Sequence, residues 1–427
     1  MDLAAETGGK NSLIVTALAD RDAAVRDIIA SAFSHSGQKC SALSLLILEE
    51  EVYRDPHFKK QLVDAARSLK VGSPWSFSTK VPPLITTPSE HLKRALTSLD
   101  EGEEWLLKPE RDHENPNLFS PGIKIGVKEG GYSHQTELFG PLLSVMKAKN
   151  LDHAITIANG TPYGLTAGLH TLDEEEKNRW AKQIRAGNLY INRPITGAIV
   201  RRQPFGGCKA SHYGVGSKAG GPNYISLFFH WNDKEDPQLP KGAVKKWLPL
   251  KDSLPSTDQL LFESSIKSYQ HWWESHYNQM RDPSQVSGEE NLFGYVPHQL
   301  MVVRVEDGDR LVDPFRFLTL CQIAGVRVEL SVSPERKEAL APFAVKEVYI
   351  ESKEQFTQRM GKGSPRRVRL FSPADEDLLK NLAKTGSFLI SGPVPQSGKA
   401  AFLSVLREVA ISSETHRYGT LNKPQSH

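Results

Sequence analysis

The first half of the sequence alternates short apolar segments with stretches whose apolar residues recur at helical spacing. Strands are predicted at 12–18, 44–50, 141–147, 165–171 and 188–191. Helices are predicted at about 20–34, 55–69, 151–158 and 173–186, and Asp20 and Asp55 are expected to cap the first two. Parallel strands need such helical crossovers, so the pattern is typical of a parallel sheet covered by helices. The sequence therefore predicts an α/β fold for roughly residues 7–207.

A second α/β unit is predicted after a linker. Residues 232–256, NDKEDPQLPKGAVKKWLPLKDSLPS, are rich in proline and charge, as linkers are. A helix is expected at about 258–279. Strands are then expected at 299–304, 326–332, 345–350, 366–371 and 386–391. A chain of 427 residues is long enough for at least two domains, each with its own core.

Composition and cysteine content exclude several classes of protein. The net charge of +3 is small for this length, which argues against a nucleic-acid partner, and no apolar run is long enough for a membrane span. The three cysteines, Cys40, Cys208 and Cys321, lie far apart without a CxxC pair, so neither a disulfide framework nor a metal site is expected. The first residues have no export-signal composition. These features predict a cytoplasmic protein.

Two short segments contain candidates for chemistry. Cys40 lies in FSHSGQKCSA, on a glycine-containing turn after a predicted helix, where a thiol can be exposed. Glu6 lies in AETGGKN, where a glycine pair lets the backbone approach another group and leaves the carboxylate as a candidate base. Taken alone, the residues leave two alternatives open: a cysteine buried in the core and a solvated glutamate.

The two segments together resemble the paired signature of the aldehyde dehydrogenase superfamily. TELFGPLL at 136–143, NGTPYGLTAGL at 159–169 and QPFGGCKAS at 203–211 resemble further motifs of that family in the same order. The resemblance implies that the Cys40 thiolate attacks an aldehyde and that its own N–H stabilises the oxyanion. It also implies that Glu6 activates the water that hydrolyses the resulting thioester. Glu137 and Phe139 would position an NAD cofactor.

A narrower resemblance concerns the substrate. NRPITGAIVRRQPFGG at 192–207 and GVGSKAGGPNY at 214–224 resemble the branch that oxidises L-glutamate γ-semialdehyde, the open-chain form of Δ1-pyrroline-5-carboxylate, in proline catabolism. In that branch, the residues matching Ser41, Gly197 and Ala198 hold the substrate α-carboxylate. A glycine-bearing loop can present N–H groups to an anion. The alternative is that the TGA segment is only a turn.

The resemblance also predicts the domain organisation. Residues 1–207 are expected to form the aldehyde dehydrogenase catalytic domain, 208–235 an oligomerisation segment, 236–256 the linker and 257–427 a C-terminal domain like the extra domain of long proline utilisation proteins. Family members begin with a Rossmann-type cofactor domain. Most of that domain is expected to be absent from this sequence. The segment 214–231 offers an apolar strand for dimer contacts.

The sequence is compatible with three functional hypotheses. The first is NAD-dependent oxidation of L-glutamate γ-semialdehyde, with a homo-oligomer or a separate N-terminal or proline dehydrogenase part as partner. The second is oxidation of another aldehyde. The third is a catalytically silent fragment that folds only within a larger assembly, which would follow from loss of the cofactor domain and of the second oxyanion donor that this domain would supply.

Overall fold

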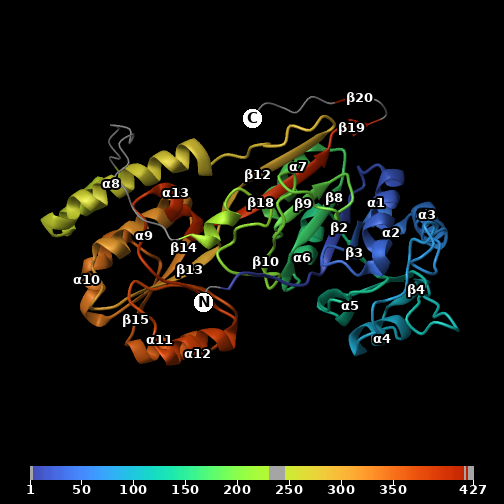
Figure 1. Cartoon of the computed structure of the whole chain (residues 1–427), viewed down its shortest axis with the longest axis horizontal. Coiled ribbons are helices and arrows are strands. Elements are labelled where there is room, and N and C mark those ends of the chain that lie inside the picture. Colours follow the sequence, from blue (N-terminus) through green and yellow to red (C-terminus); the bar gives the residue numbers. More distant parts are fainter. Residues whose placement is uncertain (1–2, 230–245, 418–419, 422–427) are drawn as a thin grey trace.

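The computed structural model describes residues 3–229, 246–417 and 420–421. Its larger sheet has nine strands in the order β12-β18-β9-β8-β2-β3-β6-β5-β4. Figure 1 shows β12, β18, β9, β8, β2 and β3 following one another across the molecule. In chain order, the strands of this sheet are β2 (Asn11–Val15), β3 (Leu43–Glu49), β4 (Glu104–Leu107), β5 (Gly122–Ile125), β6 (Leu142–Ala148), β8 (Thr166–His170), β9 (Asn188–Ile191), β12 (Glu289–Pro297) and β18 (Leu406–Glu414). The run from β5 to β18 is parallel throughout.

Helices cover both faces of this sheet. The helices of the first half are α1 (Arg21–Phe33), α2 (Glu50–Arg54), α3 (Pro56–Arg67), α4 (Glu90–Thr97), α5 (Tyr132–Gln135), α6 (Leu151–Asn159) and α7 (Glu174–Gln183). Leu13 and Val15 of β2 pack in one core with α1 and α3, whereas Ile14 packs in another with α6 and α7. Successive side chains of a strand point to opposite faces. The predicted α/β fold class is therefore confirmed.

The predicted helix starts are also confirmed. The Asp20 carboxylate accepts a hydrogen bond of 3.1 Å from the Ala23 N–H, and the Asp55 carboxylate accepts one of 2.8 Å from the His57 N–H. Both satisfy N–H groups that have no partner inside their helices. Helix α2, between β3 and the second cap, was not predicted.

Two strands from the C-terminal half complete the larger sheet. β18 runs parallel to β9, with Ala410 opposite Asn188 and Ser413 opposite Ile191, and β12 pairs antiparallel with β18 at the sheet edge (Figure 1). Neither strand was predicted from the sequence. The two halves of the chain therefore share one sheet.

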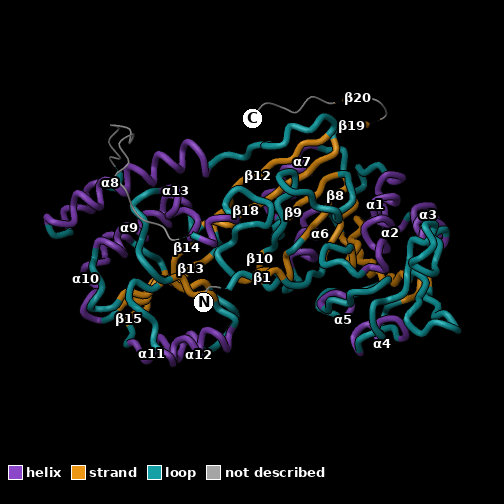
Figure 2. The backbone as a smooth tube through the Cα atoms, in the orientation of Figure 1, coloured by secondary structure: helices purple, strands orange, loops and turns teal. Residues whose placement is uncertain are grey.

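The C-terminal half also forms its own five-stranded parallel sheet, in the order β15-β14-β13-β16-β17. Its strands are β13 (Leu300–Val305), β14 (Arg327–Val332), β15 (Glu347–Ile350), β16 (Arg367–Arg369) and β17 (Phe388–Ile390), close to the predicted ranges. The main helices around it are α8 (Ser256–Trp272), α9 (Val312–Ala324), α11 (Lys353–Met360) and α12 (Glu376–Thr385). Figure 2 shows these helices outside the strands.

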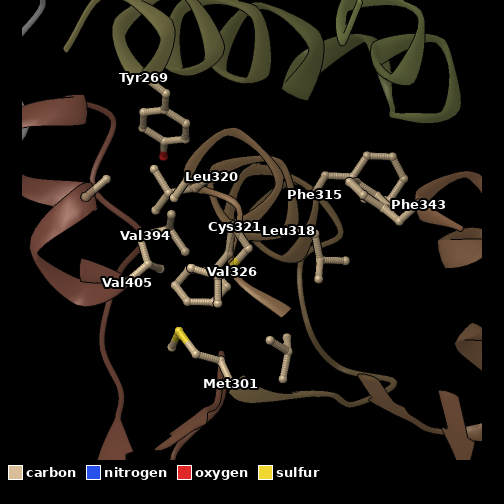
Figure 3. Close-up of a cluster of buried hydrophobic side chains, with 14 of the residues drawn as sticks. Tyr269, Met301, Phe315, Leu318, Leu320, Cys321, Val326, Phe343, Val394 and Val405 are labelled. Atoms are coloured by element: carbon tan, nitrogen blue, oxygen red, sulfur yellow. The ribbon is translucent and has the colours of Figure 1, made fainter. Parts of the chain in front are cut away.

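The core beside α9 accounts for one cysteine. Cys321 is fully buried among apolar side chains that include Leu320 and Val326 (Figure 3). Burial raises the pKa of its thiol far above the usual value, so the group stays protonated. Cys321 is therefore a packing residue with no access to a substrate.

The expected apolar strand within 214–231 is wrong for the part that is described. Tyr224–Phe228 form a 3-10 helix. Asn223 fixes this turn, because its carbonyl accepts a hydrogen bond from the Ser226 hydroxyl and its side chain donates to Glu408. The predicted linker lies outside the described residues up to residue 245, and Leu248–Ser253 then form another 3-10 helix. Among the described residues, no helix combines the length and the apolar character that a membrane span requires.

Candidate active site

The turn that carries Cys40 is held close to a second loop. Residues His35, Ser36 and Gly37 have φ values of 56°, 56° and 68°, so the chain turns sharply between α1 and Cys40. A β-carbon on Gly37 would lie 2.2 Å from the carbonyl oxygen of Gly140. Only glycine permits this approach at a left-handed position. The cysteine turn therefore packs against the loop at 137–140.

Asn11 fixes the backbone on either side of the cysteine. Its amide nitrogen donates to the carbonyls of Cys40 at 2.7 Å and Ala42 at 2.9 Å, and its amide oxygen accepts from the Thr166 N–H at 3.1 Å. Asn11 is itself buried at the start of β2. Asn11 ends the AETGGKN segment but was not predicted as a functional residue.

The Cys40 thiol is exposed at the surface of its turn, yet surrounding loops withdraw it partly from water. This burial raises the pKa of the thiol, while the backbone N–H groups of Ser41 and Cys40 itself oppose the shift by favouring the thiolate. The carboxylates of Glu137 and Glu6 add to the rise. Both predicted carboxylates are therefore near enough to Cys40 to influence its charge.

The glycine pair after Glu6 brings the backbone against Glu137. The Gly9 N–H donates to the Glu137 carboxylate at 2.9 Å, and a β-carbon on Gly8 would lie 1.8 Å from its Oε2 atom. Burial raises the pKa of Glu137, opposed by the Gly9 N–H and by the charge of Lys10. The expected close approach thus involves the backbone at Gly8 and Gly9 and the predicted cofactor residue.

Phe139 and Lys10 complete the surroundings of Glu137. Phe139 has a φ of 53° and is 42% exposed, while its neighbour Leu138 is buried. The Lys10 ammonium is buried and has no hydrogen-bond partner among the described residues. Burial lowers its pKa from 10.5 to about 7, and the charge of Glu137 opposes that shift. An exposed aromatic ring, a carboxylate and an unpartnered ammonium therefore lie in one region.

Glu6 is held on a short strand pair. β1 (Ala5–Glu6) runs antiparallel to β11 (His212–Tyr213), with Glu6 opposite His212. One Glu6 carboxylate oxygen lies 2.6 Å from His212 Nδ1, and the other accepts a 2.8 Å hydrogen bond from the Gly207 N–H. About 29% of the Glu6 side chain is exposed. His212, which directly follows the QPFGGCKAS motif, was not predicted as a functional residue.

The predicted substrate residues lie in two places. Ser41 is buried in the cysteine turn, whereas Gly197 and Ala198 lie on an exposed loop after β9. Gly197 has a φ of 84°, and the N–H groups of both loop residues have no hydrogen-bond acceptor among the described residues. No hydrogen bond within the described part of the chain joins Ser41 to this loop. Their shared role stays a prediction.

A separate cavity of about 520 Å³ lies where the two halves of the chain meet. Val200 and Pro204 line it from the first half, and Arg281, Phe293 and Tyr295 from the second. Neither Cys40 nor Glu6 lines it, so it is distinct from the cluster around the cysteine. Among the described residues, no cluster of histidine, cysteine or carboxylate side chains could hold a metal ion.

A comparison with protein families matches residues 1–232 to the aldehyde dehydrogenase family. Among curated proteins, a 1-pyrroline-5-carboxylate dehydrogenase of Bacillus cereus (strain B4264) is 38% identical over 224 residues, which is 52% of this chain and 43% of that protein. A protein of the same name from Geobacillus sp. (strain WCH70) gives the same identity and the same coverage of both chains. The chain thus spans less than half the length of the curated relatives it matches.

A solved structure extends the similarity to the C-terminal half. Proline utilization A (PutA) from Corynebacterium freiburgense superimposes with a TM-score of 0.85 at 36% sequence identity. The match covers 99% of this chain and 40% of that protein. Both α/β sheets described above therefore occur together in a known structure.

Proposed function

Because the chain belongs to the aldehyde dehydrogenase family, we propose that it oxidises L-glutamate γ-semialdehyde to L-glutamate through a thioester on Cys40. The similarity to 1-pyrroline-5-carboxylate dehydrogenases and to a proline utilization protein supports proline catabolism as the context. The single observation that carries the proposal is the position of Gly9. Its N–H binds Glu137, and its α-carbon lies so close to the Cys40 carbonyl oxygen that a β-carbon would stand 3.0 Å from it.

The first chemical step belongs to Cys40. Its thiolate sulfur forms a bond to the aldehyde carbon, and the carbonyl oxygen becomes an oxyanion. The Cys40 N–H is the proposed oxyanion donor, because the turn fixed by Asn11 holds this part of the backbone in place. The raised pKa of the thiol means that a minority of molecules carry the reactive thiolate at neutral pH.

The residues around Glu137 fit a dinucleotide cofactor. An exposed aromatic ring at Phe139 offers a stacking surface, the Glu137 carboxylate can accept hydrogen bonds from ribose hydroxyls, and the Lys10 ammonium has no partner among the described residues. NAD is the cofactor that we propose for this region. When bound, its nicotinamide supplies a hydride acceptor. Contact between the 137–140 loop and the cysteine turn would keep that acceptor close to the thiol.

Glu6 is proposed as the general base for thioester hydrolysis. Its carboxylate takes a proton from water, the water oxygen bonds to the thioester carbon, and the carbon–sulfur bond breaks to release the acid and the Cys40 thiolate. Two observations support this role: the carboxylate is partly exposed, and it influences the charge of the Cys40 thiol. Ser41 and the N–H groups of Gly197 and Ala198, which have no acceptor among the described residues, are proposed to bind the substrate α-carboxylate.

The cytoplasm is the proposed location of the protein. A thiol nucleophile has to stay reduced, which is typical of the cytoplasm. Proline utilization A, to which the chain is similar along nearly its whole length, is more than twice as long as the match, so a proline dehydrogenase part or a second copy of the chain is the proposed partner.

The test is production of reduced nicotinamide from L-glutamate γ-semialdehyde by this chain, with Cys40→Ala as the control and propanal as a competing substrate. Turnover of the semialdehyde, little turnover of propanal and no turnover by Cys40→Ala are expected. Equal turnover of both aldehydes would reject the proposed substrate. Activity that survives Cys40→Ala would reject the thioester mechanism.

A further inference from the structure

A histidine with no part in the mechanism above contacts the proposed general base. His212 Nδ1 lies 2.6 Å from Glu6 Oε1, and the imidazole is 9% exposed. The contact follows from strand register, because Glu6 on β1 stands directly opposite His212 on β11. Side chains at opposite positions of an antiparallel pair lie on the same face.

The hydrogen bond has a defined direction. An ionised carboxylate can only accept a hydrogen bond, so His212 Nδ1 carries the hydrogen and donates the hydrogen bond to Glu6. The other ring nitrogen, Nε2, is buried and has no hydrogen-bond partner among the described residues. Within the described part of the chain, the contact with Glu6 is therefore the one hydrogen bond that the imidazole makes.

A second donor acts on the same carboxylate. The Gly207 N–H donates to Glu6 Oε2, so each oxygen has one fixed donor. A β-carbon on Gly206 would stand 2.8 Å from Oε1, which shows how closely this loop approaches the carboxylate. An ionised carboxylate has about four acceptor positions, so two remain for a water molecule. The two donors can therefore orient the base without blocking it.

The strand that presents His212 is anchored on its other side. The next residue, Tyr213, packs edge-on against Phe388 of β17, with ring centroids 5.3 Å apart. Arg367 of β16 donates to the carbonyl of Gly214 at 2.8 Å. The imidazole is therefore carried by a strand packed against the C-terminal sheet, and it can fix the position of a neighbouring side chain.

We propose that His212 is a positioning residue for thioester hydrolysis, holding the Glu6 carboxylate through its Nδ1–H. The inference rests on the proposed roles of Cys40 and Glu6. A positioned base contributes to hydrolysis of the thioester but not to its formation, because attack by the thiol does not use Glu6. The two steps should therefore respond differently to loss of the imidazole.

The probe is p-nitrophenyl acetate, which acylates the cysteine without an oxidant or a cofactor. The sulfur–carbon bond of a thioester forms, the ester carbon–oxygen bond breaks, and p-nitrophenolate leaves. The initial burst of p-nitrophenolate measures acylation, and the later steady rate measures hydrolysis. His212→Ala is expected to keep the burst and to lower the steady rate about 10-fold, a part of the roughly 10²- to 10⁴-fold that general base catalysis provides.

Substitutions of different shape separate positioning from packing. The side-chain N–H of His212→Asn can occupy nearly the place of Nδ1–H, so hydrolysis within about 3-fold of the unmodified rate is expected. His212→Gln keeps the bulk of the side chain but places its N–H donor farther from the backbone than Nδ1–H, so slow hydrolysis is expected. This variant provides the same test if His212→Ala does not fold. His57→Ala, which removes an exposed imidazole on α3, should change neither phase.

A double substitution tests whether His212 acts through Glu6. Glu6→Gln should slow the steady phase, and adding His212→Ala should slow it no further, because residues that act as a unit are not additive. An additive loss, a burst that falls with the steady rate in every variant, or slow hydrolysis by His212→Asn would overturn the inference. No burst from the unmodified chain, or a burst that persists in Cys40→Ala, would instead overturn the proposed function and the inference with it.

Discussion

The backbone at Gly8 lies against the Glu137 carboxylate, so that a β-carbon at residue 8 would stand 1.8 Å from Oε2. Real side chains do not approach this closely, and either the backbone or the carboxylate would have to move. The Gly9 N–H, which binds the same carboxylate, would move with it. The glycine pair is therefore a steric requirement of the site.

We predict that Gly8→Ala lowers the free energy of unfolding by about 1–3 kcal/mol, as expected for overpacking at a tight contact. Gly308→Ala is the matched control, because nothing lies within 4 Å of the added carbon. Denaturation in urea measures both variants. Equal stability of the two variants would show that Glu137 moves aside without cost.

Alkylation of Cys40 is predicted to accelerate with pH. Burial raises the pKa of the thiol, so the thiolate fraction, and with it the rate of reaction with iodoacetamide, should rise about tenfold per unit between pH 7 and 8. Mass spectrometry of peptides follows each cysteine separately. Cys321 should react only in denaturant, because it is fully buried. A Cys40 rate that does not change over this range would contradict a raised pKa.

Lys218 is predicted to make stability depend on pH. The side chain is buried, with Nζ donating to Asn188 Oδ1 at 2.8 Å, and burial lowers its pKa from 10.5 to about 7. Between these values the unfolded chain binds a proton that the folded chain has released. The free energy of unfolding therefore rises with pH, by at most about 1.4 kcal/mol per unit.

The Lys218→Met variant should lose this contribution. Urea denaturation at pH 7, 8 and 9 should give a smaller increase than in the unmodified chain, in which Lys10 contributes in the same direction. Lys60→Met removes a lysine whose side chain is 75% exposed and should leave the increase unchanged. The same increase in Lys218→Met would mean that the buried lysine keeps its proton.

Ser412 is predicted to stabilise the junction of the two halves. Its hydroxyl accepts from Arg193 at 2.6 Å and donates to Asn291 Oδ1 at 2.6 Å. Ser412→Ala removes the 2.6 Å acceptor of the Arg193 guanidinium, while Asn291 Oδ1 keeps Gln203 Nε2 as a donor at 2.7 Å. The loss of this buried acceptor should cost about 1–3 kcal/mol in the free energy of unfolding. Ser413→Ala, at the next and less buried position of β18, is the control for a hydroxyl lost from the same strand. A cost no larger than that of the control would show that water replaces the hydroxyl.

Much of the parallel sheet could be predicted from the sequence. Buried parallel strands are continuous apolar runs, and Asp20 and Asp55 are strong helix-start signals, so these elements are encoded locally. The closeness of the glycine pair to another group was also predictable. That this group is Glu137 was not predicted: family resemblance singled out Glu137 as a cofactor residue only, and its contact with Gly9 emerges only in the fold.

Long-range features could not be predicted from local patterns. Nothing near His212 indicates that it faces Glu6, because their pairing depends on a strand register between segments about 206 residues apart. The strands β12 and β18 were missed for a related reason. The sequence of β18, LREVAISSE, mixes charged, apolar and hydroxyl residues, and its partner β9 is distant in the sequence.

The parallel pairing of β9 with β18 has a consequence for how the chain is made. Arg193, just after β9, and Ser412, within β18, are hydrogen-bonded although 219 residues separate them. At a synthesis rate of about 5–20 residues per second, β18 is synthesised roughly 10–45 s after β9. During that interval the nascent sheet has an open edge of unpaired backbone groups, the kind of surface that recruits other strands.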